Sequence, residues 1–185
     1  LYQQTSAHLL GVVLRIQKDR AQAEDVLQEV YVNVWRAAQG FEMPVFYHNR
    51  RPRTDVPYTY CESPLALAAA VDFLIVATPG GASTRHLVDA AVLEALGPQG
   101  FLVNIGRASV VATDDLVQAL QAQRIAGAGL DVFVDEPNVP EALFGNEQVV
   151  LQPHRASATL QTRTRMGEMV VASLLDSFAG KTPQG

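Results

Sequence analysis

The sequence is poor in cysteine, in net charge and in long apolar runs. Cys61 is the single cysteine among 185 residues, so no disulfide can form within the chain and a reducing compartment is expected. The net charge of −5 gives no general attraction to nucleic acid or to an anionic membrane. The longest apolar runs are interrupted, for example at Asp72, and are too short to span a bilayer. The composition therefore predicts a soluble, cytoplasmic globular protein.

From Met43 onward, short apolar runs alternate with amphipathic stretches. Apolar runs of four or five residues are typical of strands buried on both faces, and the stretches between them have helical spacing. This alternation predicts a parallel sheet in an α/β layer fold. Strands are predicted at 45–48, 58–61, 73–77, 101–105, 129–133 and 149–152, and helices at 64–71, 84–96, 113–123 and 159–178.

A cation, a carboxylate and an imidazole follow three of these predicted strands, where doubly wound sheets bind their ligands. Arg107 can bind a substrate carboxylate in a bidentate fork. His154 can transfer a proton to or from a substrate oxygen. Glu136, paired with the other imidazole nitrogen, would fix the histidine tautomer and raise the histidine pKa. The trio indicates hydride exchange between a 2-oxo acid and a nicotinamide.

Several short motifs occur in order around these three residues. They are FYHNRR at 46–51, DFLIVATPGGA at 72–82, LVNIGR at 102–107, GAGLDVF at 127–133, DEP at 135–137 and PHRAS at 153–157. With these motifs, residues 43–180 resemble the nucleotide-binding domain of the D-isomer-specific 2-hydroxyacid dehydrogenases, especially the glyoxylate and hydroxypyruvate reductases. The resemblance implies a catalytic set of Arg107, Glu136 and His154 that reduces a small 2-oxo acid to the D-2-hydroxy acid.

The same resemblance implies a set of cofactor contacts, with Asp131 on the nicotinamide side. A carboxylate after the second strand would bind the ribose of NAD, but no carboxylate occurs there before Asp55. The basic residues at that position favour NADP over NAD, and no metal ligand is expected. The expected cofactor-binding residues are Asn49, Arg50, Arg51, Thr78, Pro79, Gly80, Ile105, Gly106, Asp131 and Ser157.

The glycine-rich phosphate loop of such a domain is absent from the sequence. A strand and G-x-G-x-x-G should precede the strand at 45–48, but Gly40 leads only to Phe-Glu-Met-Pro and Gly11 lies in a helical pattern. Without the loop, the pyrophosphate loses its cradle of backbone N–H groups. We therefore expect an incomplete Rossmann-like doubly wound parallel sheet that lacks its first strand, and impaired catalysis.

The first forty residues have a different pattern. Leu9, Leu10, Val13, Leu14 and Ile16 form one stripe at helical spacing, and Val26, Leu27, Val30, Tyr31, Val34 and Trp35 form another. The two stripes predict an α-helical hairpin. With the run AEDVLQE at 23–29, residues 1–38 resemble the start of region 2 of extracytoplasmic-function sigma factors. The resemblance implies contact with the RNA polymerase core through Asp25, Gln28 and Glu29, without direct DNA readout.

Two truncated resemblances that meet near residues 39–43 indicate a composite chain. The predicted division is a sigma-like hairpin at 1–41 and a partial NAD(P)-binding domain at 42–185. A natural fusion, an engineered chimera and a mis-assembled gene all fit this pattern. The expected partners are a small 2-oxo or 2-hydroxy acid and a second copy in a homodimer. The alternative function is an interaction module that binds RNA polymerase, with the dehydrogenase part as a passenger.

Overall fold

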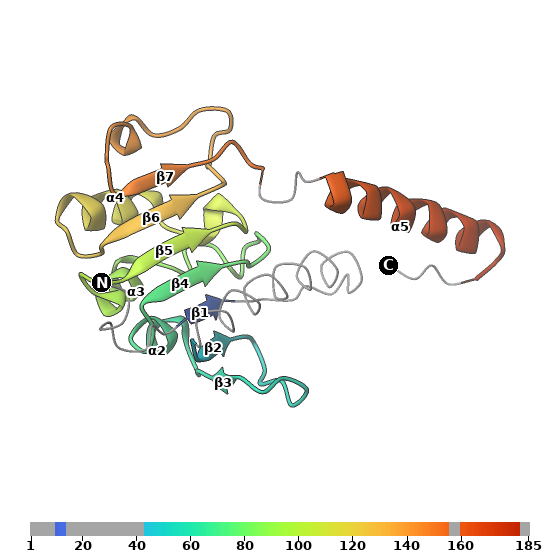
Figure 1. The fold of residues 1–185 in the computed structure, drawn as a ribbon, viewed down its shortest axis with the longest axis horizontal. Helices are drawn as coiled ribbons and strands as arrows, with labels where there is room; N and C mark the ends of the chain where they lie inside the picture. The colour runs from blue at the N-terminus through green and yellow to red at the C-terminus, as the bar shows by residue number, and fades with distance from the viewer. Residues whose placement is uncertain (1–9, 14–42, 156–159, 182–185) are drawn as a thin grey trace.

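The computed structural model describes residues 10–13, 43–155 and 160–181. Their centre is a parallel sheet of seven strands in the order β3-β2-β1-β4-β5-β6-β7 (Figure 1). The predicted α/β class and parallel sheet are therefore confirmed. The strands are β1 Leu10–Val13, β2 Val45–His48, β3 Thr59–Tyr60, β4 Phe73–Val76, β5 Phe101–Asn104, β6 Gly127–Leu130 and β7 Val149–Leu151.

Strand β1 occupies the central position that we expected to be vacant. Leu10 pairs with Val45 of β2 on one side and with Phe73 of β4 on the other. The prediction that the sheet lacks its first strand is wrong, and so is the helical interpretation of residues 10–13. Leu-Gly-Val-Val fits both a helical stripe and a short buried strand, and a slot between two parallel strands satisfies its backbone on both sides. The rest of the predicted hairpin lies outside the described residues, so the domain division at residues 41 and 42 stays a prediction.

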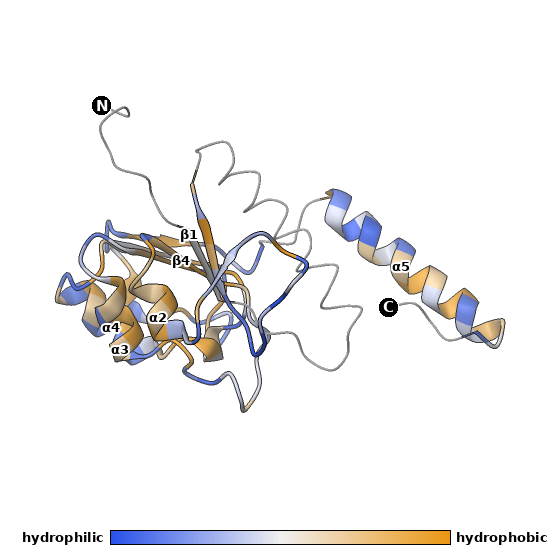
Figure 2. Cartoon of the chain, turned by 90° about the horizontal axis from the view of Figure 1, so that it is seen from below, coloured by the Kyte–Doolittle hydropathy of each residue, from blue (hydrophilic) through white to orange (hydrophobic). Residues whose placement is uncertain are grey.

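Three helices cover one face of the sheet (Figure 2). They are α2 Pro64–Ala68, α3 Ala90–Leu96 and α4 Thr113–Gln121. The core between them and the sheet consists of fully buried aliphatic side chains, which fix the positions of the strand ends that carry the site. The largest of them are Leu67, Leu74, Leu93, Leu102, Leu120 and Ile125.

Helix α3 begins later than the predicted start at residue 84. The buried Thr84 donates its hydroxyl to Pro79 O at 2.9 Å and lies close to Gly81 O at 3.1 Å, which closes the loop after β4. Val88 then forms a parallel bridge with Val111. The helix starts only after Asp89, whose carboxylate accepts a hydrogen bond from Val92 N. Tertiary hydrogen bonds therefore override the local helical pattern.

Strand β6 also differs from its predicted span of 129–133. It begins at Gly127, where an added Cβ would lie 2.5 Å from Gln148 O, and ends before Asp131. Glycine in a sequence is typical of a turn, but here it allows the neighbouring backbone to approach closely.

The last helix, α5 Leu160–Phe178, agrees closely with its predicted span and lies apart from the sheet and its helices (Figures 1 and 2). Its exposed apolar side chains are Leu160, Met166, Val170, Val171, Leu174, Leu175 and Phe178. Across the residues that the structure describes, no helix combines the length and the apolar character needed to cross a membrane.

Candidate active site

A paired carboxylate and imidazole lie in the loops that follow β6 and β7. His154 Nδ1 is 2.8 Å from Glu136 Oε2, and Glu136 Oε1 accepts a hydrogen bond from Phe133 N at 2.9 Å. Because an ionised carboxylate only accepts, Nδ1 carries the proton in this pair. That leaves His154 Nε2 for a substrate. The side chains are 44% and 36% exposed, so they are accessible from outside the protein.

The environment of Glu136 favours its ionised form. The hydrogen bond from His154 is the main cause that lowers the pKa of Glu136 below its ordinary value of 4.5, and the hydrogen bond from Phe133 N–H comes next. Desolvation opposes them, and the charges of His154 and Arg107 lower the pKa further by smaller amounts. Because this pKa is lowered, the carboxylate is ionised above pH 4.5, and its pairing is lost only as the pH falls through the lowered value. The pair is therefore intact at neutral pH.

The backbone at His154 is held in an unusual conformation. His154 has φ of 53°, in the left-handed region that a residue with a Cβ rarely adopts. The next residue, Arg155, donates its N–H to Asp131 Oδ1 at 2.6 Å, and Asp131 is only 5% exposed. Asp131, expected on the nicotinamide side of the cofactor, thus also ties the end of β6 to the backbone that carries His154.

Arg107 lies in the turn after β5, just before a short 3-10 helix, η1 Ala108–Val110. Its Nη1 donates to Gly106 O at 2.8 Å. An added Cβ on Gly106 would lie 2.6 Å from Thr78 O, and one on Gly80 would lie 3.2 Å from Arg107 Cγ. The turns after β4 and β5 are therefore packed together and fix the base of the arginine side chain. The charge of Arg107 is the smallest of the effects that lower the pKa of Glu136, so the arginine lies within electrostatic range of the pair.

A cavity of about 430 Å³ opens beside the histidine and glutamate. This volume is within the range of small-molecule sites, which are mainly apolar with a few polar groups. The two polar side chains of the pair and Gln152 stand among apolar walls. The lining residues are Phe133, Glu136, Pro137, Val139, Phe144, Leu151, Gln152, Pro153 and His154.

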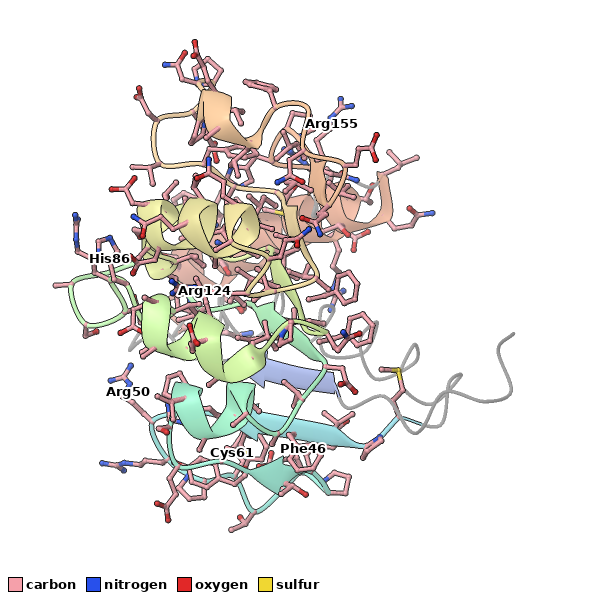
Figure 3. The ribbon with its side chains drawn as sticks, turned by 90° about the vertical axis from the view of Figure 1, so that its left-hand side faces the viewer. Phe46, Arg50, Cys61, His86, Arg124 and Arg155 are labelled. Atoms are coloured by element: carbon pink, nitrogen blue, oxygen red, sulfur yellow. The ribbon has the colours of Figure 1, made fainter. Side chains whose placement is uncertain are left out.

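The predicted cofactor contacts that the structure describes lie just beyond the ends of β2, β4, β5 and β6. Beyond β2, Arg50 and Arg51 are exposed, and Arg50 points away from the sheet (Figure 3). Asn49 is buried, and its Oδ1 accepts a hydrogen bond from Arg50 N at 2.8 Å. The turn at Thr78, Pro79 and Gly80 lies beyond β4, beside Ile105 and Gly106. Binding of a ribose phosphate by the basic residues, and of a nicotinamide at the far end, stays a prediction.

The middle of the predicted dinucleotide site lacks the glycine-rich loop that would hold a pyrophosphate. The residues after β1 would cradle the pyrophosphate, but the sequence has no glycine between Gly11 and Gly40. A cofactor could thus be held at both ends without a glycine loop between them. Ser157 and the predicted polymerase contacts Asp25, Gln28 and Glu29 lie outside the described residues.

Two contributions to the site were missed by sequence reasoning. The Phe133 N–H hydrogen-bonds Glu136, and no sequence signal predicts a backbone contact of this kind. The side chain of Asn104 bonds to the turn that carries Arg107. A polar residue that closes the apolar run Phe-Leu-Val-Asn could have indicated a buried role for Asn104.

Two protein families match the chain. Residues 32–156 match the NAD-binding domain of the D-isomer specific 2-hydroxyacid dehydrogenases, and residues 1–45 match Sigma-70 region 2. Both predicted resemblances are confirmed. The two matches overlap at residues 32–45, close to the junction predicted from the sequence.

Individual relatives point to the same dehydrogenase family. Glyoxylate/hydroxypyruvate reductase A HPR2 of Arabidopsis thaliana is 46% identical over 147 residues, which are 80% of this chain and 47% of that protein. Hydroxyphenylpyruvate reductase of Plectranthus scutellarioides is 44% identical over 155 residues, 84% of this chain and 50% of that protein. The chain thus spans about half the length of these curated relatives.

The fold agrees with a solved structure of the same kind. The NADPH-dependent glyoxylate/hydroxypyruvate reductase of Sinorhizobium meliloti, in complex with NADP and malonate, superposes with a TM-score of 0.79 at 42% identity. The superposition covers 95% of this chain and 51% of that one. Sequence and fold agree, and the chain belongs to the D-isomer specific 2-hydroxyacid dehydrogenase family, whose NAD-binding domain it carries.

Proposed function

We propose that this chain is the cofactor-binding part of an NADP-preferring reductase of small 2-oxo acids, of the glyoxylate and hydroxypyruvate type. The observation that carries the proposal is the 2.8 Å contact between Glu136 and His154, beyond the carboxyl ends of the strands, with the charge of Arg107 acting on it. A cation, an oriented imidazole and a carboxylate are the groups that reduction of a 2-oxo acid requires. Assembly as a homodimer remains a prediction from the family resemblance.

Each of the three side chains has one role in this reaction. Arg107 binds the substrate carboxylate and polarises the neighbouring carbonyl group. His154 donates the proton on Nε2 to the carbonyl oxygen during reduction, and takes it back during oxidation. Glu136 holds Nδ1 and stabilises the positive charge on the imidazole. A bound nicotinamide cofactor supplies the hydride for the carbonyl carbon.

Turnover is expected to be impaired. Without a glycine-rich loop, the negative charge of the pyrophosphate meets no cradle of backbone N–H groups. Affinity then depends on the two ends of the dinucleotide site, where Arg50 and Arg51 favour a ribose phosphate. The chain should therefore prefer NADPH to NADH, and bind both weakly.

Titration of NADPH fluorescence against the chain tests this proposal. We expect saturable binding that weakens about tenfold or more in Arg50→Ala, because one charge-assisted phosphate contact is lost. NADH binding should change little. Arg53→Ala is a matched control, since the Arg53 guanidinium lies in the same loop but is paired with Asp55 at 3.0 Å. An absence of binding at millimolar NADPH would refute the proposal.

The match of residues 1–45 to Sigma-70 region 2 supports a second candidate function. In this candidate, Asp25, Gln28 and Glu29 contact the RNA polymerase core, and the sheet is a passenger. We expect core polymerase to be retained by the immobilised chain and lost after reversal of the charges at Asp25 and Glu29. Equal retention by the reversed variant would exclude this contact.

A further inference from the structure

The turn that carries Arg107 is held by one buried side chain. Asn104 ends β5 and is only 1% exposed. Its Oδ1 accepts a hydrogen bond from Gly106 N at 3.1 Å, and its Nδ2 donates to Arg107 O at 3.2 Å. One amide group therefore binds the Gly106 N–H and the Arg107 carbonyl, which belong to the peptide groups before and after the Gly106–Arg107 link.

Backbone hydrogen bonds and close packing also hold the turn that carries Arg107. Ile105 N donates to Val76 O at 3.0 Å, and Val110 N donates to Arg107 O at 3.1 Å. Thr78 leaves no room for a Cβ on Gly106. These contacts fix the backbone of the turn, and the Asn104 amide links the end of β5 directly to Arg107.

We propose that Asn104 is a positioning residue for Arg107, and that its amide sets the direction of the arginine side chain toward the substrate carboxylate. The inference rests on the proposed function, in which Arg107 binds that carboxylate. Misplacement of a binding group by about 1 Å is costly, since bidentate recognition needs both N–H groups in line.

The asparagine amide provides both contacts at once. Gly106 N needs an acceptor, and Arg107 O takes a second donor beside Val110 N; asparagine offers both on a short side chain. An ionised aspartate accepts but cannot donate, and alanine does neither. Because the site is buried, water does not readily replace the lost partner.

The test measures the Arg107 side chain directly. In the native chain, the Arg107 Nε–H should show restricted motion by ¹⁵N relaxation, because its guanidinium is bonded to Gly106 O. In Asn104→Ala, we expect its order parameter to fall below about 0.6, the range of flexible groups. Affinity for oxamate, an unreactive 2-oxo acid analogue, should fall about tenfold. Asn104→Asp, which keeps the acceptor, serves if the alanine variant does not fold.

Asn49→Ala provides the matched control. Asn49 is also a buried asparagine after a strand, and its Oδ1 binds the next backbone N–H, but its turn carries Arg50. It should leave the Arg107 order parameter unchanged. Native-like order of Arg107 in folded Asn104 variants, or an equal loss in Asn49→Ala, would overturn the inference. If the native chain binds no oxamate, the proposed function fails, while the relaxation of Arg107 still decides the role of Asn104.

Discussion

Replacing His154 with alanine is expected to lower the rate of glyoxylate reduction by NADPH about 10²–10⁴-fold, the usual contribution of a positioned acid or base. The reason is that His154 Nε2 would donate the proton that the carbonyl oxygen takes up, while its Nδ1 is already bonded to Glu136. Single-turnover measurement of NADPH oxidation checks this without interference from product release. Binding of NADPH should be retained, because His154 lies away from the predicted phosphate contacts. A rate within a few-fold of the native chain would contradict the assignment.

Glu136→Gln separates the charge of the carboxylate from its shape. On the acid side, the native chain should lose activity only as the pH falls through the lowered pKa of Glu136, below 4.5. In the glutamine variant this acid limb should disappear, since the amide does not titrate, and the rate at neutral pH should fall because the imidazolium loses its counter-charge. A pH profile identical to that of the native chain would refute the pairing.

Replacing Val12 with proline is expected to destabilise the domain by about 1–3 kcal/mol, the cost of leaving a buried backbone carbonyl without its partner and a sizeable part of the stability of an ordinary domain. Val12 lies in β1, paired with Tyr47 on one side and Ile75 on the other. Proline has no backbone N–H, so a central strand loses a ladder hydrogen bond whichever neighbour accepts it. Urea unfolding followed by far-UV circular dichroism checks the change in the free energy of unfolding.

Val12→Thr is the control for this substitution. Threonine keeps the backbone N–H and the β-branched shape, so the midpoint of unfolding should move much less than for proline. The comparison also tests the position of β1. If residues 10–13 belonged to a hairpin separate from the sheet, proline would leave the unfolding of the dehydrogenase part unchanged.

Most strands of the fold were predictable because they are short, apolar and separated by turn residues. The predicted span at 45–48 agrees fully, and that of β5 differs by one residue at its end. The start of α3 was not predictable, since the hydroxyl of Thr84 bonds to carbonyls of the preceding loop instead of opening a helix. A sequence pattern records local preference, whereas these bonds depend on which segments meet in space.

In the candidate site too, some residues were predictable from the sequence and others were not. Arg107, Glu136 and His154 were identified from their types and their places after predicted strands, and the structure brings Glu136 and His154 into contact. The hydrogen bonds that hold the site residues in position were not predicted from the sequence. Asp131 accepts a hydrogen bond from Arg155 N, 24 positions later in the chain. Asn104 closes a turn by two hydrogen bonds, which matter because the residue is buried.

The sequence alone determined the α/β class, the family and the residue types of the candidate site, because these depend on periodicity and on motif order. It also determined that no glycine-rich loop follows β1. Only the tertiary structure decided that Leu10–Val13 fills the centre of the sheet. The physical reason is that an apolar four-residue run satisfies either a helix or a buried strand, and the open backbone groups of β2 and β4 select the strand.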